Sequence, residues 1–121
     1  MKTTIKLKRV YEEPDPGDGI RILVDRLWPR GMTREKAALD LWLKDIAPSN
    51  ELRKWFAHDP ARWDGFQERY GAELAANGGP VATLEEELKK GTVTLLYGAR
   101  DQQHNEAAVL RDWIRTHGHK A

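Results

Sequence analysis

Hydrophobic and polar side chains alternate near the start of the chain, and this period of two predicts a β-strand with one buried face. Residues 4–10 place Ile5 and Leu7 on one side and two lysines on the other, which favours a half-buried or edge position in a sheet. The segment EEPDPGDG at 12–19 predicts a loop, because proline, glycine and aspartate favour turns. Residues 21–27 are apolar enough to predict a second strand in the interior of the sheet.

Two short elements are predicted after the second strand. Thr33 has a side chain that can cap the N-terminus of a short helix over residues 34–38. In residues 39–43 leucine stands at every second position, which predicts a third extended segment.

Three longer helices are predicted in the middle of the chain, from apolar side chains three or four positions apart. The first begins at 48–49. The second begins at 59–60, where aspartate precedes a proline suited to the first helical position, and it ends near 77–78. The third extends from 79–80 to Gly91, a glycine of the kind that commonly ends a helix.

The clearest strand signal is the run TVTLLY at 92–97, whose apolar and β-branched residues predict a central position in a parallel sheet. A last helix is predicted over about 102–116. Trp55, Trp63 and Trp113 fall on the apolar faces of the predicted helices, so we expect them in the core.

Strands separated by helices predict an α/β fold. We expect a single compact α/β domain over residues 1–121, with a mostly parallel sheet of about four strands flanked by helices, because 121 residues is the size of one typical domain. The hydrophobic fraction of 40% and the charged fraction of 32% favour a globular chain over a disordered one. The order of the strands does not follow from the pattern.

Composition excludes several classes of protein. The chain has no cysteine, which excludes disulfides, thiol catalysis and cysteine metal sites. No apolar run approaches the roughly 18 residues of a membrane span, and the first ten residues lack a signal-peptide core, so we expect a cytoplasmic protein without a membrane partner. The net charge of +1 argues against a strong attraction of polyanions, although the first 36 residues carry nine Lys or Arg against six Asp or Glu.

Motifs for cofactors and metals are absent from the sequence. It contains no dinucleotide-binding fingerprint, P-loop, nucleophile elbow or zinc-protease motif, so it identifies no cofactor. His117 and His119 are spaced to share a metal, but no carboxylate lies near them in the sequence, and we predict no metal site.

Polar side chains gather where two of the predicted strands end. Because ligands of α/β proteins bind beyond the carboxyl ends of parallel strands, we expect these side chains to share one site. They are Asp25, Arg26, Trp28 and Arg30 at the end of the second strand and after it, and Tyr97, Arg100, Asp101, His104 and Asn105 at the end of the last strand and after it.

The residue types in this predicted site suit a small anion. Arginine pairs bidentately with carboxylate or phosphate, which makes Arg26, Arg30 and Arg100 candidates for binding it. Trp28 and Tyr97 are candidates for packing against the apolar part of the ligand. For proton transfer the candidates are Asp25, Asp101 and His104, of which the histidine titrates near neutral pH.

Each candidate also has a purely structural explanation. The two arginines nearest the second strand can tie their loop to the domain through ion pairs with nearby aspartates, which are Asp25, Asp40 and Asp45. Asp101 can cap the last helix, a role for which Asn105 competes, and His104 can be a surface residue of the first helical turn.

Three segments of the chain resemble the domain-of-unknown-function family 488, in its small stand-alone bacterial branch. They are RLWPRG at 26–31, a central segment at 47–74 and LLYGARDQQHNEAAVL at 95–110. The resemblance implies a compact bacterial α/β protein without an established reaction. It also implies that the central segment lies beside the RLWPRG loop, which adds Arg53 and His58 as ligand-binding candidates. Arg53 has the alternative of a surface residue whose stem covers a tryptophan.

These observations lead to one principal hypothesis and two alternatives. The first is a site for a small carboxylate- or phosphate-bearing molecule, with or without a reaction. The second is a non-catalytic module for nucleic acid or a protein partner, of which nucleic acid is less favoured because the net charge is near zero and no recognition motif is present. The third is a metal-dependent enzyme whose ligands only folding could assemble, from Asp25, Asp101, His58 and His104. The oligomeric state and the ligand do not follow from the sequence.

Overall fold

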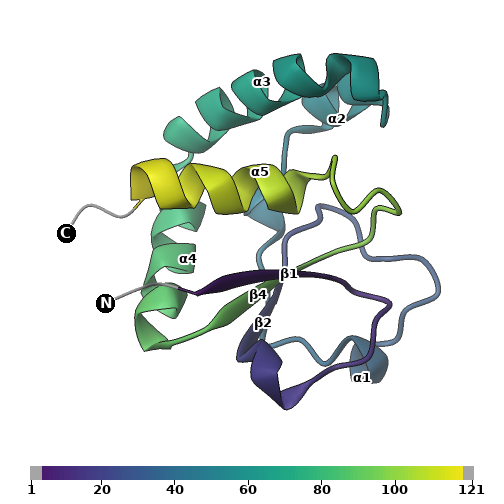
Figure 1. Ribbon diagram of the computed structural model, residues 1–121, viewed down its shortest axis with the longest axis vertical. Coiled ribbons are helices and arrows are strands. Elements are labelled where there is room, and N and C mark those ends of the chain that lie inside the picture. The colour runs from purple at the N-terminus through teal and green to yellow at the C-terminus, as the bar shows by residue number, and fades with distance from the viewer. Residues whose placement is uncertain (1–3, 119–121) are drawn as a thin grey trace.

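The computed structural model describes residues 4–118 and contains one four-stranded sheet in the order β1-β4-β2-β3, with every neighbouring pair parallel. The strands are β1 (Ile5–Arg9), β2 (Ile20–Leu23), β3 (Leu41–Trp42) and β4 (Val93–Tyr97). The sheet therefore places the first strand of the chain at one edge, directly beside the last strand (Figure 1). The predicted α/β class and the parallel sheet of about four strands are confirmed.

Five α-helices pack around this sheet. They are α1 (Arg34–Ala37), α2 (Asn50–Phe56), α3 (Trp63–Ala75), α4 (Gly78–Lys90) and α5 (Glu106–Trp113). Figure 1 shows α5 next to β1 and β4, with α2 and α3 beyond it, while α1 lies at the far side of the sheet. No helix within residues 4–118 is long and apolar enough to cross a membrane.

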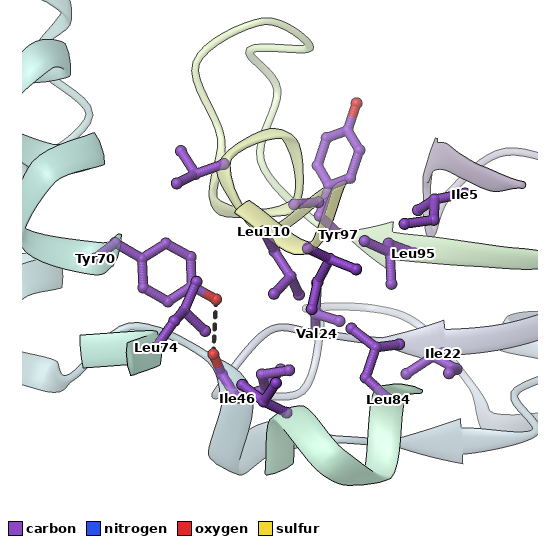
Figure 2. Packing of buried hydrophobic residues seen from close by; sticks show 14 of the residues in the cluster. Ile5, Ile22, Val24, Ile46, Tyr70, Leu74, Leu84, Leu95, Tyr97 and Leu110 are labelled. Atoms are coloured by element: carbon purple, nitrogen blue, oxygen red, sulfur yellow. Dashed lines mark hydrogen bonds between the residues drawn. The ribbon is translucent and has the colours of Figure 1, made fainter. Parts of the chain in front are cut away.

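The two faces of the sheet bury two separate hydrophobic clusters, because successive side chains of a strand point to opposite faces. On β4, Leu95 belongs to the larger cluster under α2 to α5, whereas Leu96 belongs to a smaller cluster beside α1. Figure 2 shows Tyr70 of α3 and Leu110 of α5 within the larger cluster. The Tyr70 hydroxyl donates a hydrogen bond of 2.6 Å to the carbonyl of Ile46, which satisfies both groups inside the core.

A buried ion pair helps to hold α1 against the second face. Arg21 of β2 is buried, pairs with Asp18 at 2.5 Å and donates to the last carbonyls of α1. Burial opposes ionisation of Asp18, but hydrogen bonds from Lys8, the Asp15 backbone and Arg21 outweigh it and lower the pKa of this carboxyl.

Two predicted boundaries are wrong. The second strand ends at Leu23 and not at 27, since the Asp25 carboxylate, in place of a backbone carbonyl, accepts the hydrogen bond from the Gly98 N–H. The last helix begins at Glu106 and not near 102, since its cap is Asn105.

The three tryptophans expected in the core are only half-buried, because their helices lie on the outside of the larger cluster. Trp55 has the guanidinium groups of Arg62 and Arg69 over its ring, at 5.4 and 4.0 Å from the ring centre. Trp63 packs on Phe56 and Phe66, and Trp113 stacks on a histidine one turn later.

Candidate functional site

A pocket of about 800 Å³ opens beyond the carboxyl ends of β2 and β4, the edge of the sheet where α/β proteins bind ligands. Its walls come mainly from three parts of the chain, which are residues 25–30 after β2, residues 47–58 around α2, and residues 98–106 between β4 and α5. Parallel strands and short connections thus bring together segments that are distant in sequence.

Most charged side chains that line the pocket are cationic. They are Arg26, Arg30, Arg53 and Lys54, against the two carboxyl groups of Asp25 and Glu106, with His58 and His104 as further polar groups. The pocket thus carries an excess of positive charge even though the whole chain is close to neutral.

Arg26 is held by backbone oxygens. Its guanidinium donates to the carbonyls of Ala47 and Pro48, at 3.1 and 3.2 Å, and so joins the loop after β2 to the segment before α2. The alternative of an ion pair with a nearby aspartate is wrong for Arg26, and Asp40 instead accepts a hydrogen bond from the Arg21 backbone. Arg26 therefore has a structural role and also lines the pocket.

The other predicted residues of the RLWPRG loop lie at the pocket as well. Trp28 donates from its indole nitrogen to the Met32 carbonyl at 2.7 Å and meets Trp42 edge to face. Arg30 is exposed, and its carbonyl accepts a hydrogen bond of 2.9 Å from the Tyr11 hydroxyl. The tryptophan is thus fixed by packing, whereas the arginine side chain extends into solvent at the rim.

Asp25 and Glu106 form a carboxyl pair at the pocket. One Asp25 oxygen, Oδ2, accepts from the Gly98 N–H at 2.8 Å, and the other, Oδ1, is buried with no N–H or hydroxyl donor among residues 4–118. Burial, followed by the hydrogen bond to Asp25 and its negative charge, raises the pKa of Glu106 well above its usual range. When Glu106 is protonated, its hydroxyl supplies a donor for Asp25.

The sequence interpretation missed two charged residues of the pocket, Glu106 and Lys54. A glutamate in the first turn of a helix has an ordinary local explanation, since negative charge there is favoured by the helix dipole. Lys54 was missed for a similar reason, because a lysine in the last turn of α2 looks like a solvated surface residue.

His104 lies at the pocket, but Asp101, another predicted candidate for proton transfer, lies outside it. The His104 ring nitrogen Nδ1 is 2.9 Å from Asp101 Oδ2, and the ring meets Trp63 edge to face. Asp101 also accepts from the backbone N–H groups of His104 and Gln103, and these bonds, followed by the imidazole, lower its pKa to about 2. Asp101 thus orients the imidazole from the solvent side.

The alternative in which Asp101 caps the last helix is wrong. Asn105 caps α5, since its Oδ1 accepts from the Ala108 N–H at 2.9 Å and its Nδ2 donates to the Asp101 carbonyl at 3.0 Å. Asn105 is buried, so a structural requirement accounts for it although it also lines the pocket.

Tyr97 and Arg100 do not line the pocket. Tyr97 is buried in the larger cluster, where burial, followed by the charge of Glu12, raises its pKa. Arg100 is exposed on the loop that leaves β4. Eight predicted residues do lie together at the pocket, namely Asp25, Arg26, Trp28, Arg30, Arg53, His58, His104 and Asn105.

Two consecutive left-handed residues end α2 and bring His58 to the pocket. Ala57 has a φ of 47° and His58 a φ of 55°, which is uncommon for residues other than glycine. The Ala57 N–H donates to the Arg53 carbonyl at 2.9 Å and closes the helix. The predicted start of the next helix at 59–60 is met by a short 3₁₀ turn, Pro60–Arg62, capped by Asp59.

The structure offers no support for a metal-binding cluster in the part of the chain it describes. Among residues 4–118, no three His, Cys, Asp or Glu side chains lie close enough together to hold a metal ion. Asp25, Asp101, His58 and His104 are therefore not assembled into such a group. His119, considered with His117 as a metal pair, lies outside the described residues.

A family model and several related proteins match this chain over almost its whole length. A family model described as "Inactive DUF488-N3 subclade" matches residues 4–121. The uncharacterised protein YeaO of Escherichia coli K12 is 47% identical over 112 residues, covering 93% of this chain and 97% of that protein. The uncharacterised proteins Mb3100c of Mycobacterium bovis and Rv3073c of Mycobacterium tuberculosis are each 41% identical over 109 residues, covering 90% of this chain and 92% of theirs. No solved structure shows a significant match.

Proposed function

The chain belongs to the DUF488 family, in its inactive N3 subclade, and from this premise we propose that the pocket binds a small carboxylate- or phosphate-bearing molecule without transforming it. The family membership confirms the resemblance seen in three segments of the sequence. A description of the subclade as inactive favours binding over catalysis for a pocket with a charged lining.

This proposal rests on one observation, which is that four cationic side chains line the same pocket. Arg26 comes from the loop after β2, Arg30 from the rim of the same loop, and Arg53 and Lys54 from α2. Guanidinium groups suit carboxylate and phosphate because they donate two parallel hydrogen bonds to a planar or tetrahedral anion. Since Arg26 is already anchored on two carbonyls, part of the ordering cost of binding is removed in advance.

The pocket also provides apolar surface for the rest of the ligand. Phe56 and Phe66 stack on each other with ring centres 4.4 Å apart and both line the pocket. Leu27, which also lines it, is 61% exposed, an unusual state for a large aliphatic side chain. An anion with an organic body thus fits this lining better than an inorganic ion does.

The alternative of a nucleic-acid-binding module rests on four cations near the N-terminus, which are Lys2, Lys6, Lys8 and Arg9. Lys2 lies outside the described residues, and the other three are engaged within the molecule. Lys6 donates to the Gly17 carbonyl at 2.8 Å, and Lys8 pairs with Asp18 at 2.9 Å. Arg9 donates to the backbone after β4, at 2.8 and 3.2 Å. These contacts leave the pocket as the better-supported anion site.

Thermal unfolding in the presence of single anions tests the proposal. The panel contains phosphate, adenosine monophosphate, citrate and hexanoate, each added to the wild type, to Arg30→Met and to Arg100→Met. Arg100→Met is the matched control, because it removes an exposed arginine that does not line the pocket. A ligand at 100 times its dissociation constant stabilises by about 2.7 kcal/mol, which raises the melting temperature of a domain of this size by roughly 10 °C.

The expected result is stabilisation of the wild type and the Arg100→Met variant by the same anion, with a smaller effect on Arg30→Met. An equal response of all three proteins, or no response of the wild type to any anion, contradicts the proposal. NMR spectra of the bound anion, taken before and after prolonged incubation, separate binding from reaction, and consumption of the anion would favour an enzyme. A response to a single-stranded oligonucleotide alone, lost steeply with salt, would favour the nucleic-acid module.

A further inference from the structure

The buried side of the pocket carries a second recognition element that a simple anion does not use. We propose that the Asp25–Glu106 carboxyl pair binds an amino or amidino group, so that the pocket selects a small dipolar molecule with an anionic group at one end and a nitrogen cation at the other. This inference rests on the proposed function, since the anionic end is held by the same cationic rim.

Three elements hold Asp25 in a fixed position. Its carbonyl accepts from the Trp42 indole N–H at 2.7 Å, and its Oδ2 accepts from the Gly98 N–H at 2.8 Å. Position 98 admits this close approach because it is glycine, since a Cβ atom there would lie 3.0 Å from Asp25 Oδ2. Glu106 approaches from the first turn of α5. The pair therefore joins a residue that follows β2 to a residue of α5, and Asp25 is fixed by Trp42 of β3 and by the Gly98 N–H after β4. So many fixed contacts distinguish a built site from a chance surface cluster.

Neither carboxyl of the pair has a cationic partner. No ion pair of Asp25 or Glu106 is formed among residues 4–118, although four cations line the same pocket. Arg26 is committed to two carbonyls, and Arg53 donates to the Asn50 side chain at 3.0 Å. Apart from a protonated Glu106, Asp25 Oδ1 has no donor among residues 4–118, so this buried oxygen is available to a ligand N–H that displaces the Glu106 proton.

The charged groups around the carboxyl pair influence its protonation before a ligand binds. Arg53 of α2 favours ionisation of Glu106, whereas Asp25 opposes it. Tyr70 of α3 and Tyr97 of β4 also lie within electrostatic reach. The raised pKa of Glu106 favours a state in which the two carboxyl groups share one proton and carry one net negative charge.

A ligand ammonium or amidinium can take the place of the shared proton. It supplies several N–H donors, enough for Asp25 Oδ1 and for a Glu106 carboxylate together. The proton of Glu106 passes to water as the ligand cation enters, so binding of the ligand nitrogen releases up to about one proton per site. An anion without such a nitrogen offers no donor to the carboxyl pair. The pocket is therefore expected to bind dipolar ligands more tightly than simple anions.

The first test compares matched probes on the wild-type protein by isothermal titration calorimetry at pH 7. The pairs are 6-aminohexanoate with hexanoate, and 2-aminoethyl phosphate with ethyl phosphate. We expect the aminated member of at least one pair to bind about tenfold more tightly than its partner, which corresponds to about 1.4 kcal/mol. For the carboxylate pair, whose acid group is fully ionised at pH 7, titrations in buffers of different ionisation enthalpy are expected to report proton release for 6-aminohexanoate and none for hexanoate.

Two variants then assign the selectivity to the pair. Glu106→Gln keeps a donor toward Asp25 and keeps one negative charge, so we expect it to retain the preference for the aminated probe while losing the proton release. The double variant Asp25→Asn/Glu106→Gln removes both ionisable groups and is expected to lose the preference. Glu51→Gln, which changes an exposed glutamate in the first turn of α2, is the matched control and is expected to behave as the wild type.

The outcomes separate this inference from the proposed function. If hexanoate and ethyl phosphate bind the wild type as tightly as their aminated partners, the role of the carboxyl pair is overturned and anion binding stands. If no anion of any kind binds, both ideas fall together. Proton release that persists in Glu106→Gln would also overturn the inference, since the released proton would then come from another group.

Discussion

Replacing Glu106 by glutamine is expected to stabilise the protein at neutral pH, although the substitution removes a charge that the α5 dipole favours. In the folded protein, burial and the neighbouring Asp25 raise the pKa of Glu106 well above its ordinary value of 4.5. Between that ordinary value and the raised folded pKa, the unfolded chain has lost this proton and the folded protein keeps it. Folding therefore takes up a proton, and the free energy of unfolding falls as the pH rises toward the folded pKa.

The size of the effect follows from one proton. A single proton of difference between the two states changes the free energy of unfolding by about 1.4 kcal/mol per pH unit. From pH 5 to pH 7 the loss in the wild type from this group is thus at most about 2.7 kcal/mol. Partial exposure of Glu106 makes this number a ceiling. Glutamine has no proton to exchange, so Glu106→Gln lacks this component of the pH dependence.

Urea unfolding followed by tryptophan fluorescence at pH 5, 6, 7 and 8 measures the difference. The stability of Glu106→Gln relative to the wild type is expected to increase with pH over this range. Glu51→Gln removes an exposed glutamate from the first turn of α2, and we expect it to lose about 0.3–1 kcal/mol, with little dependence on pH. If Glu106→Gln loses stability to the same extent as Glu51→Gln at every pH, the carboxyl pair does not retain a proton and the reasoning fails.

Three further predictions concern the framework that positions the pocket. Tyr70→Phe removes the 2.6 Å hydrogen bond to the Ile46 carbonyl and leaves this acceptor buried, so urea unfolding is expected to show a loss of about 1–3 kcal/mol. Asn105→Ala removes the cap of α5, and a loss of about 1–2 kcal/mol in the same assay is expected; no loss would mean that another residue caps this helix. Gly19→Ala places a Cβ atom 2.3 Å from a backbone oxygen at a φ of 65°, so its melting temperature should fall sharply, whereas Gly78→Ala, in open space on α4, should raise it slightly.

The local elements of this protein were largely predictable, because each depends on contacts within a few residues. The apolar run of β4 identified the fully buried central strand. Thr33 and Ser49 cap helices in the structure through side chains that accept from a backbone N–H three residues later. The end of β2 was predicted wrongly because it depends on a group far away in the sequence. There the Gly98 N–H donates to the Asp25 side chain.

Sequence position alone indicated the edge of the sheet where a site would lie, because the carboxyl ends of parallel strands share that edge whatever the strand order. It did not decide which side chains turn inward. Arg30 lies at the pocket and Arg100 does not, although each arginine follows a strand in the same edge region. Side-chain direction in loops depends on packing against other segments, and no local rule contains that information.

The sequence by itself determined the fold class, the edge of the sheet and the kinds of residue available there. Tertiary structure alone decided the strand order, which places β1 beside β4, and the pairing of Asp25 with Glu106. Each of these two carboxyl groups has a plain local explanation, one at a strand end and one in a first helical turn. The pKa of Glu106 is raised only because the crossover connections bring both groups into one pocket, where a single negative charge costs far less than two.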